Sequence, residues 1–234
     1  MTLKKIRLLQ VFFENDINPW EVPAFRGAVI ATAGKEHILF HNHEKNKFRY
    51  SYPLIQYKQI RRKPMIMSLD EGVDEIHHFF ENMQLGIILG ERPYEMKISN
   101  LYLNQQVMQV WDKMWEYRID NWLALNSENY RKYQTLEGLN ENLDMLSKTM
   151  VGNILSFAKG IGWTIDKEIK LLITRLEDPK LVTYKGQKLM AFCVTFKTNV
   201  YLPNYLGLGK GASTGFGVVR HINTNKFSQT SLKQ

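Results

Sequence analysis

The stretch Leu3-Lys-Lys-Ile-Arg-Leu-Leu-Gln-Val-Phe-Phe13 predicts a β-strand, and after Pro19 the apolar spacing of residues 21–33 predicts a helix. Residues 48–58 are aromatic and β-branched, and Pro53 divides them into two strands, the second of which residues 64–69 extend. Residues 70–83 predict a helix and residues 85–89 a further strand. The order strand–helix–strand–strand–helix–strand is typical of a ferredoxin-like or RNA-recognition-like domain.

A second unit of the same class is expected after Gly90-Glu-Arg-Pro93, whose turn-forming residues predict a domain boundary. Strands are predicted at 94–103 and 115–125, a helical region at 127–160, strands at 168–176 and 188–201, and a last strand at 216–222. In the helical region the apolar positions recur every three or four residues: Leu139, Leu143, Leu146, Met150, Ile154 and Phe157. We therefore expect an α+β protein of two tandem ferredoxin-like domains, residues 1–90 and 94–234.

The composition is that of a globular protein with a packed core. Of the 234 residues, 44% are hydrophobic and 23% charged, which argues against a disordered chain or a coiled coil. The single cysteine, Cys193, excludes a disulfide scaffold and a zinc finger. No apolar run approaches the roughly 20 residues that span a bilayer. We expect a soluble cytoplasmic protein that does not bind a membrane.

The net charge of +8 is concentrated at the two ends of the chain. Residues 1–63 carry 12 basic and 5 acidic residues, and residues 207–234 carry 4 basic and no acidic residues. Residues 64–206 carry 15 basic and 18 acidic residues. If the two ends lie side by side, they form one positive surface of the kind that binds polyanions. The alternative is a charge that serves solubility alone.

Five of the 15 glycines lie in one glycine segment, Gly207-Leu-Gly-Lys-Gly-Ala-Ser-Thr-Gly-Phe-Gly217: Gly207, Gly209, Gly211, Gly215 and Gly217. Glycine permits positive φ and leaves backbone N–H groups free to face an anion. A phosphate-binding P-loop needs Gly-Lys-Ser/Thr and a following helix, whereas Gly211 follows Lys210 and strand-like residues come next. The segment therefore does not fit a nucleotide-binding loop.

Continued by two valines, the glycine segment resembles the signature loop of the CRISPR-associated repeat-RNA-processing endoribonucleases of the RAMP superfamily. A second block is similar to the N-terminal domain of one branch of that family: Phe25-Arg-Gly-Ala-Val29, Leu39-Phe-His-Asn-His43 and Tyr50-Ser-Tyr-Pro-Leu-Ile-Gln-Tyr-Lys58. The resemblance implies a metal-independent enzyme that cuts the CRISPR precursor transcript within each repeat, leaving a 2′,3′-cyclic phosphate and a 5′-hydroxyl. It also implies no cofactor. The implied partners are CRISPR repeat RNA, as precursor and as processed guide, and subunits of a CRISPR effector complex.

His41 and His43 are the candidate general acid and base. Attack by the ribose 2′-oxygen needs a base for the 2′-hydroxyl and an acid for the leaving 5′-oxygen, and histidine titrates near working pH. Which histidine takes which role stays open. Without a clear third ligand, even counting His37 or Glu44, the pair makes a weak metal site, so we expect no metal there.

Further candidates surround the two histidines. Tyr50 or Tyr52 could hydrogen-bond the 2′-hydroxyl or the phosphate, and we favour Tyr50. Lys35 could stabilise the phosphorane. His77 and His78 lie in an amphipathic helix and are interpreted as structural. His221 follows the glycine segment and could touch RNA, but we do not assign it this role.

Candidate RNA-binding residues lie at both ends of the chain: Lys58, Arg61, Arg62 and Lys63, the glycines of the glycine segment, and Lys210. The alternative for any one of these cations is a solvated charged face. A second hypothesis for the whole protein is a non-catalytic RNA-binding subunit of a CRISPR ribonucleoprotein complex. The His-x-His pattern with its tyrosines favours the enzyme.

Overall fold

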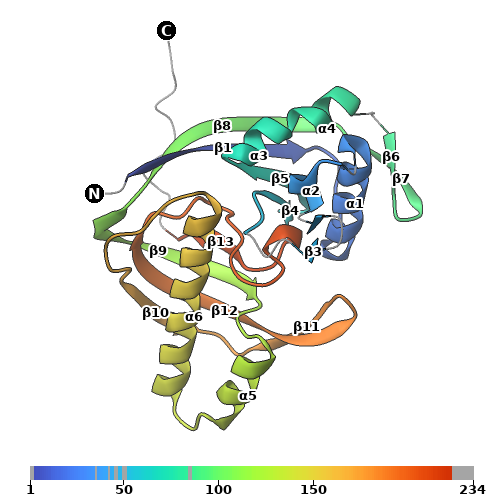
Figure 1. The fold of residues 1–234 in the computed structure, drawn as a ribbon. Helices are drawn as coiled ribbons and strands as arrows, with labels where there is room; N and C mark the ends of the chain where they lie inside the picture. The colour runs from blue at the N-terminus through green and yellow to red at the C-terminus, as the bar shows by residue number, and fades with distance from the viewer. Residues whose placement is uncertain are drawn as a thin grey trace.

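The computed structural model describes residues 3–34, 36–41, 43–44, 47–48, 52–83 and 86–222, with the backbone alone at residues 41, 43, 44, 47 and 48. Two antiparallel sheets lie one above the other, each with helices of its own (Figure 1). Residues 3–108 build the first sheet and its helices, and residues 110–222 build the second. No helix among the described residues is long and apolar enough to cross a membrane.

The described residues of the first unit form the following elements in chain order. They are β1 Lys4–Phe13, η1 Pro19–Glu21, α1 Val22–Ala33, α2 Ile38–His41, β2 His43–Glu44, β3 Lys47–Phe48, β4 Ile55–Ile60, β5 Lys63–Leu69, α3 Glu71–Glu75, α4 His77–Asn82, β6 Gly86–Leu89, β7 Arg92–Glu95 and β8 Ile98–Met108. The main sheet has the antiparallel order β4-β5-β1-β8, with α1 after β1 and α3–α4 after β5. This is the ferredoxin-like arrangement that the sequence predicts.

The strands of the first unit differ from the prediction in three respects, and the helix predicted at 70–83 is divided at Ile76 into α3 and α4. Residues 63–69 do not extend the preceding strand, because Arg61 and Arg62 adopt positive φ and turn the chain back into a β4–β5 hairpin. Residues 86–89 pair with β7 in a second hairpin. The fourth strand of the sheet is β8, which pairs with β1 along its length. The expected boundary at 90–93 is thus a hairpin turn, and the first sheet continues to Met108.

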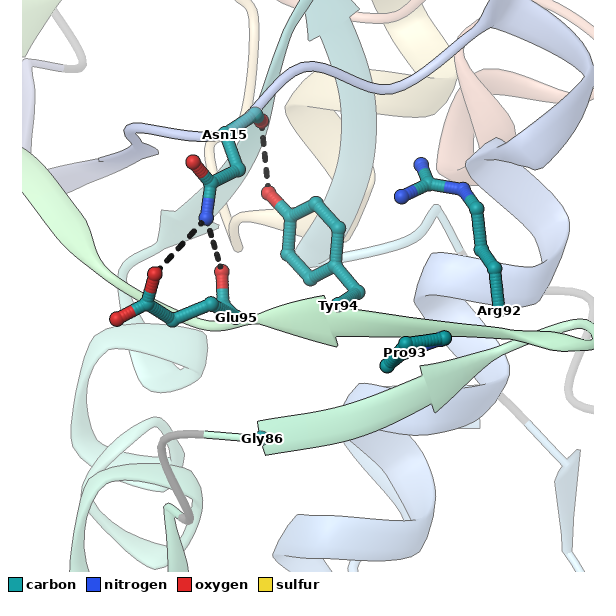
Figure 2. A pocket seen from close by; sticks show the side chains of 6 residues that line it. All are labelled: Asn15, Gly86, Arg92, Pro93, Tyr94 and Glu95. Atoms are coloured by element: carbon teal, nitrogen blue, oxygen red, sulfur yellow. Dashed lines mark hydrogen bonds between the residues drawn. The ribbon is translucent and has the colours of Figure 1, made fainter.

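The β6–β7 hairpin is fastened to the loop that follows β1. The Tyr94 hydroxyl donates to the Asn15 carbonyl at 2.8 Å, and Asn15 Nδ2 donates to the Glu95 carbonyl at 3.1 Å, beside a pocket of about 550 Å³ (Figure 2). Arg92 Nε donates to Glu21 Oε1 at 2.7 Å, and this contact lowers the pKa of the Glu21 carboxyl. The polar groups around the pocket therefore hold the hairpin in place.

The second unit has the same strand order as the first, but the helix expected between β12 and β13, the last two strands of its sheet in chain order, is absent from the described residues. Its elements are β9 Val110–Trp122, α5 Ser127–Thr135, α6 Leu139–Gly160, β10 Leu171–Leu176, β11 Lys180–Tyr184, β12 Gln187–Val200, η2 Ala212–Thr214 and β13 Val218–His221. The sheet order is β10-β12-β9-β13, with β11 added to β12. In a ferredoxin-like unit a second helix would join β12 to β13. Here residues 201–217, including the glycine segment, take its place.

Helix α6 confirms the predicted apolar spacing. Leu146, Met150, Ile154 and Phe157 are fully buried, whereas Leu139, in the first turn, is exposed. The core that they enter is shared with the first unit, because it includes residues on one face of the first sheet: Ile6, Leu8, Met65, Met67 and Leu69. The opposite face of that sheet packs on α1 and α4. The two units are therefore joined by a continuous apolar core.

Gly217→Ala tests how tightly the glycine segment is packed. Gly217 has φ 60°, and an added Cβ would overlap the Leu208 carbonyl oxygen. Gly186, with φ 77° and open space around it, is the matched control. We expect Gly186→Ala to lower the free energy of unfolding by about 1–2 kcal/mol through backbone strain, and Gly217→Ala to lower it by about 3 kcal/mol or more. Urea unfolding followed by circular dichroism measures both, and equal losses would contradict the packing.

Candidate functional site

The glycine segment lies against the first unit. Its short helix η2 contacts β4 and α1 (Figure 1). Gly215 lies beside β4, where an added Cβ would be in ordinary van der Waals contact with the Tyr57 carbonyl oxygen, at 3.7 Å. The segment thus connects the end of the second unit to the sheet of the first.

A buried polar network centred on Gln56 makes this connection specific. Gln56 Oε1 accepts the N–H of Gly207 at 3.0 Å, and Gln56 Nε2 donates to the Tyr52 hydroxyl at 2.8 Å. The Tyr52 hydroxyl in turn donates to the Gly207 carbonyl at 2.5 Å. Burial raises the pKa of Tyr52, so the phenol stays protonated as this donor. Tyr52 therefore has a structural role in the described fold.

Several N–H groups of the glycine segment are hydrogen-bonded within the protein. Gly207 donates to Gln56, Leu208 donates to the Gly217 carbonyl at 2.8 Å, and Gly217 donates to the Asn121 carbonyl at 3.1 Å. Gly207 and Gly217 are also buried. Their N–H groups already have acceptors within the protein and are not free to face an anion, contrary to the sequence expectation. Gly209, Gly211 and Gly215 remain partly accessible.

Lys58 is not on the surface, contrary to the prediction that it grips an RNA backbone. Its side chain is fully buried, and Nζ donates to Gln56 Oε1 at 2.5 Å. Strand β4 is covered by both units, which the local pattern of basic residues does not reveal. Burial lowers the pKa of Lys58 well below its usual range because the charged form is poorly solvated.

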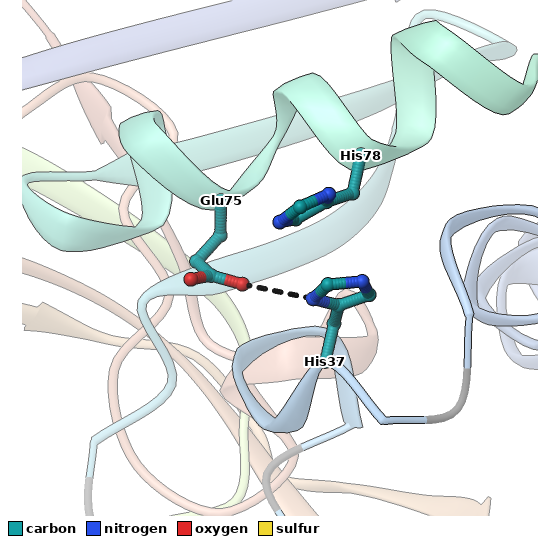
Figure 3. A group of neighbouring side chains, drawn as sticks. All are labelled: His37, Glu75 and His78. Atoms are coloured by element: carbon teal, nitrogen blue, oxygen red, sulfur yellow. Dashed lines mark ion pairs between the residues drawn. The ribbon is translucent and has the colours of Figure 1, made fainter.

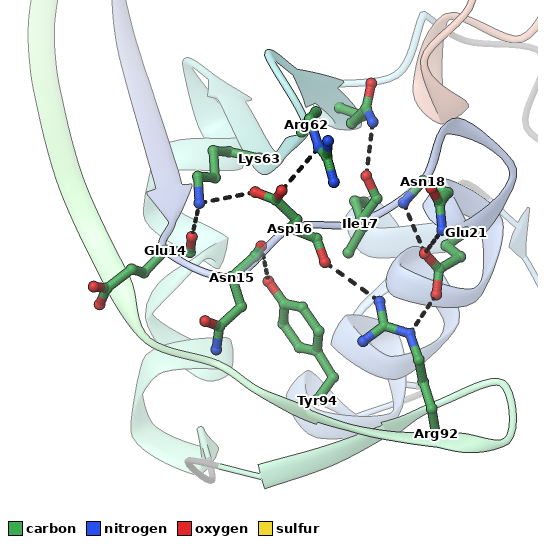
Figure 4. A network of polar contacts seen from close by, with 11 residues as sticks. Glu14, Asn15, Asp16, Ile17, Asn18, Glu21, Arg62, Lys63, Arg92 and Tyr94 are labelled. Atoms are coloured by element: carbon green, nitrogen blue, oxygen red, sulfur yellow. Dashed lines mark hydrogen bonds and ion pairs between the residues drawn. The ribbon is translucent and has the colours of Figure 1, made fainter.

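The other predicted cations of this stretch lie at the β4–β5 turn. Arg62 Nε and Lys63 Nζ each lie 2.8 Å from a carboxylate oxygen of Asp16 (Figure 4). Lys63, then Arg62, lower the pKa of Asp16. For Arg61 the described residues supply no hydrogen bond or ion pair. Two of the three surface cations are thus already paired with a carboxylate.

Lys210 is part of a cationic and aromatic surface whose other residues were not predicted from the sequence. Lys210 Nζ lies 5.6 Å and Lys185 Nζ 5.8 Å from the centroid of the Tyr184 ring. Lys210 also lines a pocket of about 410 Å³ between α5 and the β11–β12 hairpin, together with Arg131 and Lys188. We call these five residues the Tyr184 surface. The charge distribution along the sequence did not indicate this surface, because four of its residues come from the middle of the chain, which is net acidic.

The predicted catalytic side chains are outside the described part of the chain. Lys35 and Tyr50 lie outside the described residues, and His41 and His43 are described by backbone alone. The backbone places His41 at the end of α2, which contacts β4. The Tyr57 hydroxyl donates to the Phe40 carbonyl at 3.1 Å and holds α2 on that strand. Helix α2, which ends at His41, and the glycine segment therefore both contact strand β4.

His221 and the pair His37 and His78 lie in different surroundings. His221 Nε2 lies 2.8 Å from the Leu202 carbonyl, and burial lowers the pKa of its half-buried ring, which suits a structural role. By contrast, His37, Glu75 and His78 place their ligand atoms within 4.8 Å of one another (Figure 3). These three are the half-buried group that could hold a metal ion.

Comparison with known proteins accounts for both units. The family model of the Cas6b N-terminal domain matches residues 4–107, and that of the Cas6b C-terminal domain matches residues 109–222. The chain belongs to the Cas6b family. The two Cas6b models meet at the junction of β8 and β9, where the first sheet ends.

Solved Cas6b structures share this fold over 94% of the chain. One, described as Cas6b, is 27% identical with a TM-score of 0.86, and covers 94% of this chain and 100% of its own. Another, described as the CRISPR RNA processing endoribonuclease Cas6b, is 25% identical with a TM-score of 0.71 and the same coverage. An uncharacterized protein of Methanocaldococcus jannaschii is 40% identical over 112 residues, 47% of this chain and 75% of that protein.

Lys58→Met tests the buried amine. Because the folded-state pKa of Lys58 is lowered, the unfolded chain binds more protons between that pKa and about 10.4, so wild-type stability rises with pH in this window. Methionine removes the titration and leaves the bond between Gln56 and Gly207. We expect the variant to be at least as stable as wild type at pH 7, and its advantage to shrink by pH 9.5. Urea unfolding at several pH values measures the difference in stability between the variant and wild type, with Lys132→Met, at an exposed position, as control. A difference for Lys58→Met that does not change with pH would refute the prediction.

Proposed function

We propose that this protein is an endoribonuclease that cleaves CRISPR precursor RNA within its repeats. The observation that carries the proposal is the match of the Cas6b models to residues 4–107 and 109–222. A Cas6b of the same fold is described as a CRISPR RNA processing endoribonuclease. The docking of the glycine segment and α2 on β4 supports a site shared by the two units.

In the proposed reaction the ribose 2′-oxygen attacks the adjacent phosphorus, and the bond to the 5′-oxygen breaks. The products are a 2′,3′-cyclic phosphate and a 5′-hydroxyl. His41 and His43 take the proton from the 2′-hydroxyl and give one to the leaving oxygen. Tyr50 and Lys35 contact the reacting phosphate and stabilise its developing negative charge. No metal ion takes part in these steps.

The Tyr184 surface is proposed as part of the RNA-binding face. Aromatic rings stack on unpaired bases and lysines neutralise phosphates, so Tyr184, with Lys185 and Lys210 near its ring, suits a single-stranded part of the repeat. Arg131 and Lys188 extend the positive surface into the adjoining pocket. Processed guide RNA and subunits of a CRISPR effector complex would be further partners.

Cleavage of the cognate repeat RNA in EDTA tests the chemistry. We expect full activity with the chelator, no cleavage when the sugar at the cut site is 2′-deoxy, and a loss of about 10²-fold or more for His41→Ala or His43→Ala. His77→Ala removes an exposed histidine and serves as control. A requirement for divalent metal, or cleavage of the 2′-deoxy substrate, would refute the mechanism.

Two other outcomes separate the alternatives. Tight binding without any cleavage would favour a non-catalytic RNA-binding subunit. Cleavage that survives both histidine substitutions would keep the function and refute the assignment of these residues.

Lys210→Gln tests the RNA-binding face. If Lys210 neutralises a phosphate, the slope of log K against log salt concentration should decrease in magnitude by about 0.7–0.9. Lys132→Gln, on α5 but paired with Glu128 at 2.8 Å, is the matched control and should leave the slope unchanged. Filter binding over a range of salt concentrations measures both. Equal slopes for Lys210→Gln and wild type would remove Lys210 from the interface.

A further inference from the structure

A cluster of ionisable side chains lies where the connection between α1 and α2 meets α3 and α4. His37 belongs to the turn before α2, where its N–H donates to the Gly34 carbonyl at 3.3 Å and its carbonyl accepts from Phe40 N at 3.2 Å. Phe40 is buried in the core. The backbone therefore holds the His37 side chain toward α3 and α4 (Figure 3).

The other two members of the cluster come from a helix interrupted at Ile76. Glu75 is the last residue of α3, and His78 is the second residue of α4. Ile76 and Phe79 point into the core and are buried, which leaves Glu75 and His78, three positions apart, on the side that faces His37. The exposed fractions of the three side chains are 21% for His37, 35% for Glu75 and 28% for His78.

The distances in the cluster suit a tetrahedral metal ion. His37 Nδ1 lies 3.4 Å from Glu75 Oε2. Two ligands each about 2.0–2.2 Å from a tetrahedral Zn²⁺ ion are about 3.3–3.6 Å apart. Because all three ligand atoms lie within 4.8 Å of one another, His78 has to move by only a small amount to join them.

The second nitrogen of each histidine has a carboxylate nearby. Glu36 lies 3.8 Å from His37 Nε2, and Glu81 lies 3.9 Å from His78 Nδ1, which leaves Nε2 of His78 for an ion. Metal-bound histidines commonly donate their other N–H to such a carboxylate, which orients the ring. The carboxylates also make the surroundings favourable for a cation.

In the described state the two rings stack, with centroids 3.6 Å apart and planes at 24°. Nitrogen lone pairs lie in the ring plane, so stacked rings do not aim at one point. Rotation of the His78 ring about χ2, a soft torsion, directs its nitrogen at the ion and opens the stack. Metal binding and ring stacking are therefore alternative states of the same residues.

We propose that His37, Glu75 and His78 bind a divalent transition-metal ion of the zinc class, with solvent as the remaining ligand. Two imidazoles and one carboxylate are typical of Zn²⁺ sites, whereas Mg²⁺ and Ca²⁺ select oxygen ligands. The bound ion joins the α1–α2 connection to α3–α4. The site uses none of the proposed catalytic residues, so it is independent of the proposed reaction and compatible with cleavage in EDTA.

Calorimetric titration of the untagged, metal-free protein with Zn²⁺, and visible absorption with Co²⁺ as a spectroscopic substitute, test the site. We expect one ion per chain, a tetrahedral Co²⁺ spectrum, no comparable binding of Mg²⁺, and a higher thermal midpoint with Zn²⁺. His37→Gln, Glu75→Gln and His78→Gln should each weaken binding by about tenfold or more. Thermal unfolding without metal shows that each variant is folded.

His77→Gln is the matched control, because His77 neighbours His78 but belongs to a different group, His77, His78 and Glu81. It should bind Zn²⁺ as wild type does, and so should the double variant His41→Gln/His43→Gln. Absence of binding at millimolar Zn²⁺, or equal binding of Mg²⁺, would overturn the proposal. So would affinity that falls in His77→Gln, or in the double variant, while His37→Gln and Glu75→Gln bind normally.

Discussion

The side-chain amide of Gln56 is the contact on which the arrangement of the two units depends. It accepts from Gly207 N–H, donates to the Tyr52 hydroxyl and accepts from the Lys58 amine, all within the buried interface. A buried polar group without a partner is strongly unfavourable, so these groups constrain one another. Apolar packing holds the units together, but the amide determines the register at which the glycine segment meets β4.

The glycine segment illustrates how a loop can replace a helix without loss of order. It occupies the position of the missing second helix of the C-terminal unit, and hydrogen bonds within the segment and to Asn121 and Gln56 hold part of its backbone. Gly217 is needed because the Leu208 carbonyl occupies the space of a side chain. Much of the glycine content is thus explained by close backbone packing, which leaves Lys210 as the exposed group that the segment presents.

The sequence predicted those helices and strands whose formation depends on residues close together in the chain. The apolar spacing of α6 and the strand–helix order of the first unit are confirmed. Each of these elements buries one face, and the apolar residues of that face recur at a regular spacing in the sequence. The β4–β5 turn was missed because Arg61 and Arg62, rather than glycine or asparagine, adopt the positive φ. Strand β8 was not assigned to the first sheet, because most of its side chains are exposed and do not alternate between buried and exposed positions.

Long-range proximity was the part that the sequence could not supply. The burial of Lys58 depends on the second unit, and the Tyr184 surface combines residues from three distant segments. The approach of His37 to Glu75 and His78 likewise depends on the packing of α1 against α4. The roles of His41, His43, Tyr50 and Lys35 stay predictions, because their side chains lie outside the described part of the chain.

The direct passage from β8 to β9, separated only by Gln109, has a consequence for the order in which the protein folds during synthesis. The first sheet closes when β8 pairs with β1, as in the pair Lys4 and Met108, so it can form before most of the second unit has left the ribosome. The second sheet has to wait for β13, which pairs with β9 about 100 residues later in the chain. The contact between Gly207 and Gln56 is therefore formed late, onto a first sheet that is already complete.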